Sequence, residues 1–564
     1  MNTRDPIDPL RSAKRNSPWF VMSVLAHVIL LVVLGLMFVR QRVQRPHDDE
    51  GFIAISHHPA PEPIDPVAIE PPIVRAPIPP DAKGELVDDL VIEFPIDVSP
   101  AKEDLSKDIG DPNSIDLLPD SGPKSSSAIG TGTIGGRGDG VTARWRPYGT
   151  KGPEHIKGGR TPPGLTVQTQ KAVRVGLIWL CRHQNPDGSW SPASMKDRCD
   201  PKRPCYDPKL AANDHYDEGL TSLALLCFLG AGFDHRCELD LVDTTCEKRH
   251  RIGEVVRRGL EWLKKRQNQD GSFSRDRAFL YNEALATMAM SEAFGLSGAR
   301  YWREPAQRAV AFLQKAQRPS PSGNGAWGWR YASRTDVEDF AKGTSDPEYL
   351  KALYDSDTSV TTWCVMALKS AQLSGLEVDK AAFAGAVDYC KFATGGEGLV
   401  GYLDAKSAGG TVSGPFDGQF VYHPTTMSAL GMCIRTFAAH DADDPFLDLA
   451  AKRIAQDLPT VSKSRDSIDY YYWYYASLAL NQFDGPDSPR KQTGKYWNPW
   501  NKAMVDAVLA LQDQTERGCT TGGWIASDRW ASASGAGPLY STAMNVLTLE
   551  VYYRYPNAFG RKRN

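Results

Sequence analysis

A motif that returns along the second half of the chain constrains the fold more than any other feature of the sequence. Gln184 to Trp190 reads Gln-Asn-Pro-Asp-Gly-Ser-Trp, and Gln267 to Phe273 reads Gln-Asn-Gln-Asp-Gly-Ser-Phe. Weaker copies lie near Trp327, Tyr402, Phe446 and Trp524. A repeat at this spacing predicts stacked copies of one supersecondary unit rather than an irregular domain.

A second and more apolar helix is expected after each copy. These stretches are dense in Ala, Leu, Met and Cys and hydrophobic nearly all round, which is typical of helices buried on every side. They are expected at residues 216–229, 281–294, 357–373, 423–437, 469–480 and 540–553. The preceding helices, such as Val255–Arg266, have a polar face and belong outside. We therefore predict an all-α fold of six helix pairs. They should close into a double-layered (α/α)6 barrel, because the spacing is irregular and the terminal pairs are not polar caps.

The motif over paired helices resembles the squalene cyclase and protein prenyltransferase repeat superfamily, over about residues 168–556. The resemblance implies an α/α toroid, here bounded at 166–556, in which the motif itself is structural. The residues agree with this, because Asp187-Gly188 and Asp270-Gly271 are turn dipeptides and the glutamine can bond a helix end.

The same resemblance implies two chemistries, and the sequence matches neither completely. Triterpene cyclases protonate their substrate from Asp-x-Asp-Asp, whereas the corresponding stretch here is Asp355-Ser-Asp357-Thr358. Prenyltransferase β-subunits hold zinc through Asp-x-Cys and a later His, and the matching positions are Asp357, Ser359 and His423. Serine replaces the cysteine, which leaves fewer than the three protein ligands of a catalytic zinc site. No cofactor is therefore expected, zinc included.

The amino-terminal ends of the inner helices form the candidate functional site, because helix dipoles and polar first-turn residues gather there at one mouth. Asp357 and His423 open adjacent inner helices and are the candidate catalytic pair. The candidate ligand-binding residues are Asp217, Tyr281, Asp355, Asp469, Tyr471, Trp473 and Tyr540. Helix capping by the acids and core packing by the aromatic residues are the simpler alternatives, and both stay open.

Two functions compete on this basis. The first is a non-enzymatic binding or scaffolding module, with a pocket at the barrel mouth for an apolar or saccharide ligand. The second is a terpenoid-processing (cyclase- or prenyltransferase-like) or lyase-type enzyme that uses the mouth acids. Aromatic walls suit carbocations and sugars alike. Nucleic acid is not an expected partner, because 65 Lys+Arg stand against 68 Asp+Glu and residues 121–564 carry only +6.

The first 165 residues predict a membrane anchor and a tether. Residues 19–39 are apolar for long enough to cross a bilayer, and Arg40, Arg42 and Arg45 follow. Residues 40–165 are rich in proline and acid, then in Gly and Ser, and such a composition forms no core. We expect residues 1–18 in the cytoplasm and a single pass through the inner membrane. The toroid should be periplasmic, with a basic tail at 557–564.

Ser23 and His27 stand four residues apart, so they share one face of the apolar helix. This pair, together with the proline-rich stalk, resembles the anchor of TonB-type energy transducers. The resemblance implies contact with a proton-motor complex. The alternative is an imidazole that is merely tolerated near the headgroups.

Ten cysteines divide into helical residues, which suit small core positions, and loop residues. An oxidising compartment favours disulfides in the loops. We predict the pairs Cys199–Cys205 and Cys237–Cys246, while Cys519 has no obvious partner. A metal site made of the four paired thiols is the alternative, but their spacings do not suit the short zinc knuckles.

Overall fold

A computed structural model of the chain describes residues 165–559, with gaps at 200–203, 207–213, 276–277, 324, 343–354, 408–424, 462–467, 491–492, 516–517, 526–527, 529–530, 532–535 and 556. All described residues belong to one compact unit. The predicted span at 19–39, the linker, Ser23, His27 and His423 lie outside them. Within these described segments, no helix combines the length and apolarity needed to cross a bilayer.

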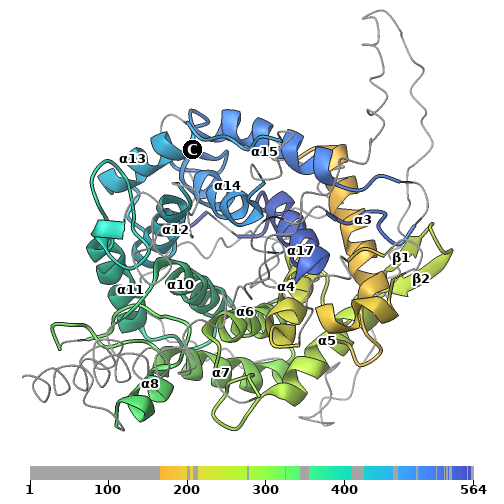
Figure 1. Cartoon of the computed structure of the whole chain (residues 1–564), viewed down its shortest axis with the longest axis horizontal. Helices are drawn as coiled ribbons and strands as arrows, with labels where there is room; N and C mark the ends of the chain where they lie inside the picture. Colours follow the sequence, from red (N-terminus) through yellow and green to blue (C-terminus); the bar gives the residue numbers. More distant parts are fainter. Residues whose placement is uncertain are drawn as a thin grey trace, which may run out of the picture. The chain divides into compact units, whose positions relative to one another are not determined.

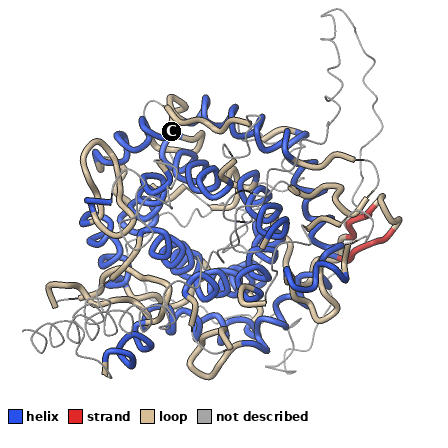
Figure 2. Tube along the Cα trace, viewed as in Figure 1, coloured by secondary structure: helices blue, strands red, loops and turns tan. Residues whose placement is uncertain are grey.

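Helices dominate the described residues and form two concentric layers (Figures 1 and 2). The inner layer holds α4 (Asp217–Gly230), α6 (Leu280–Ser297), α10 (Thr358–Leu373), α12 (Thr426–Ile434), α14 (Tyr470–Asp484) and α17 (Gly537–Leu549). Each inner helix contacts the next, and the last, α17, contacts the first, α4, so the six helices form a closed ring. The predicted helical class is therefore confirmed.

The outer layer holds α3 (Val167–His183), α5 (Ile252–Arg266), α7 (Arg300–Lys315), α11 (Lys380–Phe392), α13 (Pro445–Ile454) and α15 (Trp497–Leu511). Shorter elements are α8 (Arg334–Ala341), the 3-10 turns Pro192–Asp197 and Ala405–Ser407, and a π-helical turn, Arg435–Ala439, that extends α12. All 14 residues of α4 are buried, whereas α5 is amphipathic and ends on Lys264, Lys265 and Arg266. This contrast is the one that the sequence predicts between inner and outer helices.

The last inner helix differs from its expected bounds. It runs from Gly537 to Leu549 instead of 540–553. Pro538 lies in its first turn, where a proline needs no hydrogen-bond partner for its nitrogen. The chain then turns sharply through Tyr553 and Arg554, beside the carboxyl ends of the inner helices.

The motif glutamine makes the same two hydrogen bonds in four turns. Gln184 Nε2 donates to its own turn at Gly188 O and to Val255 O of α5, both at 2.9 Å. Equivalent pairs are made by Gln267 and Gln317. Gln512 completes the series by donating to Ala172 O of α3 at 2.9 Å. Each turn therefore fastens the next outer helix, and the last turn fastens the first.

The turn glycine and aromatic residue have structural roles. Gly188 has a φ of +100°, and a Cβ there would lie 2.2 Å from Arg258 O. Glycine is the residue that adopts this positive φ readily and has no Cβ to meet the Arg258 carbonyl. Trp190 is fully buried, and its indole nitrogen donates to Leu180 O at 2.8 Å. The motif therefore builds the interface between neighbouring pairs, as the sequence predicts.

A short antiparallel hairpin, β1 (Asp240–Asp243) with β2 (Lys248–Arg251), was not expected from the sequence. Cys237 precedes β1, while Cys246 lies in the turn at the far end. A strand of four residues spans about 13 Å, which exceeds the roughly 4.4–6.8 Å Cα separation of a disulfide. Both thiols are free. The structure thus corrects the predicted Cys237–Cys246 bridge.

Candidate functional site at the amino-terminal mouth of the ring

Three hydroxyl groups meet inside the ring at its amino-terminal end. Tyr281, Ser359 and Tyr471 are each the second residue of an inner helix. The Tyr281 hydroxyl lies 2.6 Å from Ser359 Oγ, which also bonds the Tyr471 hydroxyl. In the ring, α12 lies between α10 and α14. The bond between Ser359 and Tyr471 therefore joins two inner helices that are not neighbours in the ring.

Helical periodicity divides the aromatic run of α14 into two faces. Tyr474 and Tyr475 pack against Trp363 of α10, with ring centroids 6.0 and 5.3 Å apart. Tyr475 also packs edge-on against Tyr471, four residues earlier. Tyr472 faces the outer layer, where its hydroxyl donates to Asp457 O at 2.9 Å. Tyr471, Tyr474 and Tyr475 therefore face α10, and Tyr472 does not.

Asp357 is the N-cap of α10 and is fully buried. Its Oδ1 accepts the Val360 N–H at 2.7 Å, whereas its Oδ2 has no hydrogen-bond partner in the described part of the chain. Burial raises its pKa to about 7, against the Val360 hydrogen bond and the positive charge of Arg330. The residue is thus a cap, as the simpler alternative holds, and also an acid that can hold a proton near neutral pH.

Two further acids at this end are buried. Burial raises the pKa of Asp217, the first residue of α4, to about 7. It does the same for Glu283 of α6, which accepts hydrogen bonds from the Phe273 and Ser274 N–H groups and from the Ser274 hydroxyl. Asp217 Oδ1 has no hydrogen-bond partner among the described residues. Both Glu283 oxygens thus accept hydrogen bonds from the motif turn, whereas one Asp217 oxygen could accept a bond from a ligand.

The remaining predicted site residues lie at different places. Asp355 is half-buried and accepts a hydrogen bond from Arg330 at 3.0 Å. Asp469 caps α14 through the Tyr472 N–H at 2.9 Å, and Trp473 packs edge-on against Tyr470. Tyr540 is a half-buried residue of α17. The predicted contact between Asp357 and His423 falls outside the described residues.

Several buried polar atoms of the inner helices have no hydrogen-bond partner in the described segments. They are Ser291 Oγ, Ser428 Oγ, the Tyr474 and Tyr475 hydroxyls, Ser541 Oγ and Asn545 Oδ1. Leaving such a group unsatisfied costs about 1–3 kcal/mol. None of these residues is among the predicted ligand-binding residues, because the atoms that lack a partner can be identified only once the helices are placed.

Two surface hollows lie away from this mouth. One, of about 510 Å³, is lined by residues from the segment after α13 and from α15, including Leu458 and Lys502. The other, of about 430 Å³, lies between α3, β2 and α5 and is lined by Arg182 and His250. Neither touches Asp357 or the hydroxyl row.

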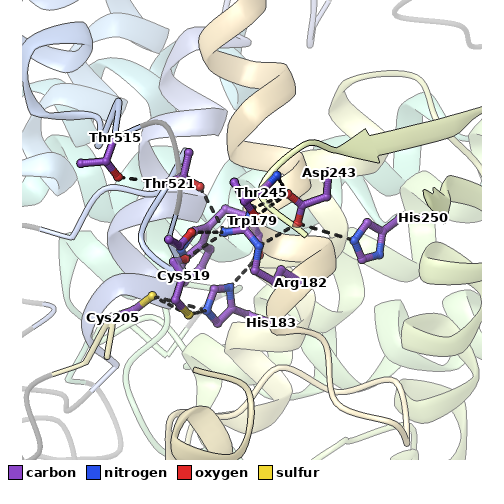
Figure 3. A network of polar contacts seen from close by, with 11 residues as sticks. Trp179, Arg182, His183, Cys205, Asp243, Thr245, His250, Thr515, Cys519 and Thr521 are labelled. Carbon is purple, nitrogen blue, oxygen red and sulfur yellow. Dashed lines mark hydrogen bonds and ion pairs between the residues drawn. The ribbon is translucent and has the colours of Figure 1, made fainter. Parts of the chain in front are cut away.

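The predicted pair Cys199 and Cys205 belongs to a larger cluster. The Cys205 thiol lies 3.3 Å from Cys519 Sγ and 3.4 Å from His183 Nε2 (Figure 3). Together with Cys199, these ligand atoms all lie within 4.8 Å of one another, and the three thiols are free. Cys519, for which the sequence suggested no partner, is therefore part of this cluster.

Neither a family model nor a curated protein matches the chain. Among solved structures, a type II terpene cyclase from Scytonema matches at 14% identity with a TM-score of 0.41, over 68% of this chain and 98% of that chain. The α-1,6-mannanase GH76A of Salegentibacter sp. HEL1_6 matches at 10% identity with a TM-score of 0.43, over 68% and 98%. Likeness at this level assigns neither a reaction nor a ligand to this chain.

Proposed function

We propose that this chain is a membrane-anchored ring whose amino-terminal mouth binds a small saccharide outside the cytoplasm. The observation that carries the proposal is the hydroxyl row Tyr281–Ser359–Tyr471, which joins three inner helices beside the aromatic pair Trp363 and Tyr475. Aromatic surface combined with a few convergent polar groups is typical of ligand sites.

The unpartnered polar atoms favour a hydroxylated ligand over a hydrocarbon. A hydrocarbon in the lumen would leave the Tyr474 and Tyr475 hydroxyls and Asn545 Oδ1 without hydrogen bonds. A saccharide supplies donors and acceptors to such groups, while its C–H faces pack on the rings of Trp363 and Tyr475. Saccharide binding would therefore supply hydrogen bonds to buried polar atoms whose lack of partners destabilises the ligand-free protein.

The proposal includes an architecture and a location. The ring would consist of six copies of one helix-pair unit, which the four equivalent glutamine contacts support. Residues 19–39 would anchor it in the inner membrane, and residues 40–165 would carry it into the periplasm. Ser23 and His27 would contact a proton-motor complex within the bilayer.

Binding can be tested on the full-length chain in detergent, titrated with mono- and oligosaccharides while tyrosine and tryptophan fluorescence is followed. Tyr475→Phe should weaken saccharide binding roughly two- to tenfold, because one hydrogen bond contributes about 0.5–1.5 kcal/mol. Tyr472→Phe, whose hydroxyl faces the outer layer, is the matched control and should bind normally. Binding of isoprenoids but of no saccharide would contradict the proposed ligand class.

A second candidate, an acid-catalysed reaction on the bound ligand, is favoured by Asp357. Its pKa of about 7 leaves the carboxyl group protonated in part of the molecules at neutral pH, and its Oδ2 makes no hydrogen bond within the described residues. A positioned acid with such a pKa is suited to proton donation. Asp357→Asn preserves the cap but cannot donate an acid proton. Turnover measured by mass spectrometry should then stop while binding persists, and unchanged turnover would exclude this candidate.

A further inference from the structure

A cluster of one imidazole and three thiols lies where the first and last parts of the ring meet. His183 ends α3, Cys199 and Cys205 follow within the next 22 residues, and Cys519 lies in the turn between α15 and α17. We propose that these four residues bind one structural zinc ion, which joins the first helix pair to the last.

The separations suit tetrahedral coordination. Zinc–sulfur bonds of about 2.3 Å and zinc–nitrogen bonds of about 2.0–2.1 Å place the sulfur atoms about 3.8 Å apart and sulfur about 3.5 Å from nitrogen. Cys205 Sγ lies 3.3 Å from Cys519 Sγ, and His183 Nε2 lies 3.3 and 3.4 Å from these two sulfur atoms. A disulfide would use only two of the three thiols and would leave the imidazole unused.

The side chain of His183 is oriented so that its Nε2 can bind a metal. Its Nδ1 lies 2.8 Å from Trp179 O, so this nitrogen carries the hydrogen and the lone pair of Nε2 is directed at the sulfur atoms. The ring also stacks on Trp179, with the centroids 3.9 Å apart. Metal-bound histidines usually donate their second nitrogen in this way, which fixes both tautomer and orientation.

A cationic side chain supports the cysteine loop (Figure 3). Arg182 donates to Cys519 O at 2.9 Å, and its other nitrogens bond the Asp243 carboxylate of β1 at 2.7 and 3.0 Å. The Asp243 carboxylate holds the guanidinium in place, and the guanidinium in turn holds the backbone of the Cys519 turn. Hydrogen bonds to the ligand residues from such outer groups are a regular feature of metal sites.

The composition of the cluster favours zinc in a structural role. Three thiolates and one imidazole are a common ligand set of closed zinc sites, in which no coordination position is left for a substrate. All four residues are buried. The ion would join segments more than 300 residues apart in sequence, so it would constrain the unfolded chain strongly. It is independent of the ligand site proposed at the mouth.

The experiment measures metals in the full-length chain, purified in detergent without chelators, by mass spectrometry of the elements. We expect about one zinc ion per chain, and a loss of at least tenfold in Cys519→Ser. Cys246→Ser changes an exposed thiol outside the cluster and should keep the zinc. If Cys519→Ser fails to fold, His183→Cys provides the test, because four thiolates should still hold zinc and cobalt(II) loading should then show an altered thiolate spectrum.

Thiol chemistry supplies a second readout. In the zinc-loaded chain Cys199, Cys205 and Cys519 should resist alkylation, and a strong chelator should release all three together. A chain that neither contains nor takes up zinc, or in which peptide mapping finds a disulfide between two of these cysteines, would overturn the proposal. A different stoichiometric metal would overturn the assignment to zinc.

Discussion

The two ends of the inner ring both bury acids, but they differ in whether a buried arginine lies beside those acids. At the carboxyl end, Arg554 makes two hydrogen bonds to Glu292 at 2.9 and 3.0 Å, and Ser370 donates to the same carboxylate. At the amino end, Asp217 and Asp357 each keep an oxygen without a hydrogen bond in the described segments. Paired groups specify structure, whereas buried unpaired groups are expected where a protein carries function.

The largest loss of stability is expected when the buried arginine at the carboxyl end is removed. Arg554→Met leaves Glu292 and the nearby Glu550 buried without their cation. Removing one partner of a buried ion pair costs about 3–5 kcal/mol. Urea unfolding of the two proteins measures the difference. The double variant Arg554→Met with Glu292→Gln should recover part of the loss, and equal instability of the single and double variants would argue against this pairing.

The hydrogen bonds that close the ring should contribute less to the unfolding free energy than this ion pair. Gln512→Ala removes two buried hydrogen bonds, one of which reaches Ala172 of the first outer helix. It leaves carbonyl groups unpaired, so we expect a loss of about 1–3 kcal/mol of unfolding free energy. Gln184→Ala, which removes the equivalent bonds inside the ring, is the matched control. Because Gln512 is the motif glutamine whose bonds join the last turn to α3, hydrogen exchange in α3 should rise more in Gln512→Ala than in Gln184→Ala.

The smallest change in stability is expected when a tyrosine hydroxyl is removed from one face or the other of α14. Tyr472→Phe loses the hydrogen bond to Asp457 O and should lower the unfolding free energy by about 1 kcal/mol. Tyr475→Phe removes a buried hydroxyl that has no partner in the described segments, so stability should stay the same or rise slightly. Thermal unfolding of both variants compares them. A loss in Tyr475→Phe equal to that in Tyr472→Phe would mean that the lumen hydroxyls are structurally satisfied.

The sequence predicts most of the fold because the signals involved are local. The apolar periodicity of α5 separates outer from inner helices, and the Asp-Gly turns indicate where each pair begins. Asp357 was predicted as a first-turn residue and is indeed a cap. The shared partner of Tyr281 and Tyr471, Ser359, could not be predicted, because it lies on a third helix whose placement depends on the packing of the ring.

The cysteine prediction missed the part played by Cys519 and His183 because it paired neighbours in sequence. Ring closure brings Cys519 from the last turn beside Cys205 and His183 from the first. The predicted ring contained the signal, since closure places these two turns together and Cys519 was left without a partner. The hairpin was missed because its strands are only four residues long and mostly polar.

The central claim is that the mouth holds unpaired acids at a cost to stability. It is tested most directly by the unfolding free energies of the wild type and of Asp357→Asn, compared at about pH 5 and about pH 8. Burial raises the pKa of Asp357 from 3.8 to about 7 in the folded chain, so its stabilising contribution is complete below the unfolded pKa and is lost as the pH rises through 7. Asparagine keeps the cap and does not titrate. Asp357→Asn should therefore gain stability relative to the wild type between the two pH values, by more than about 1 kcal/mol. An equal difference at both pH values would mean that Asp357 is an ordinary ionised cap, and would contradict the account.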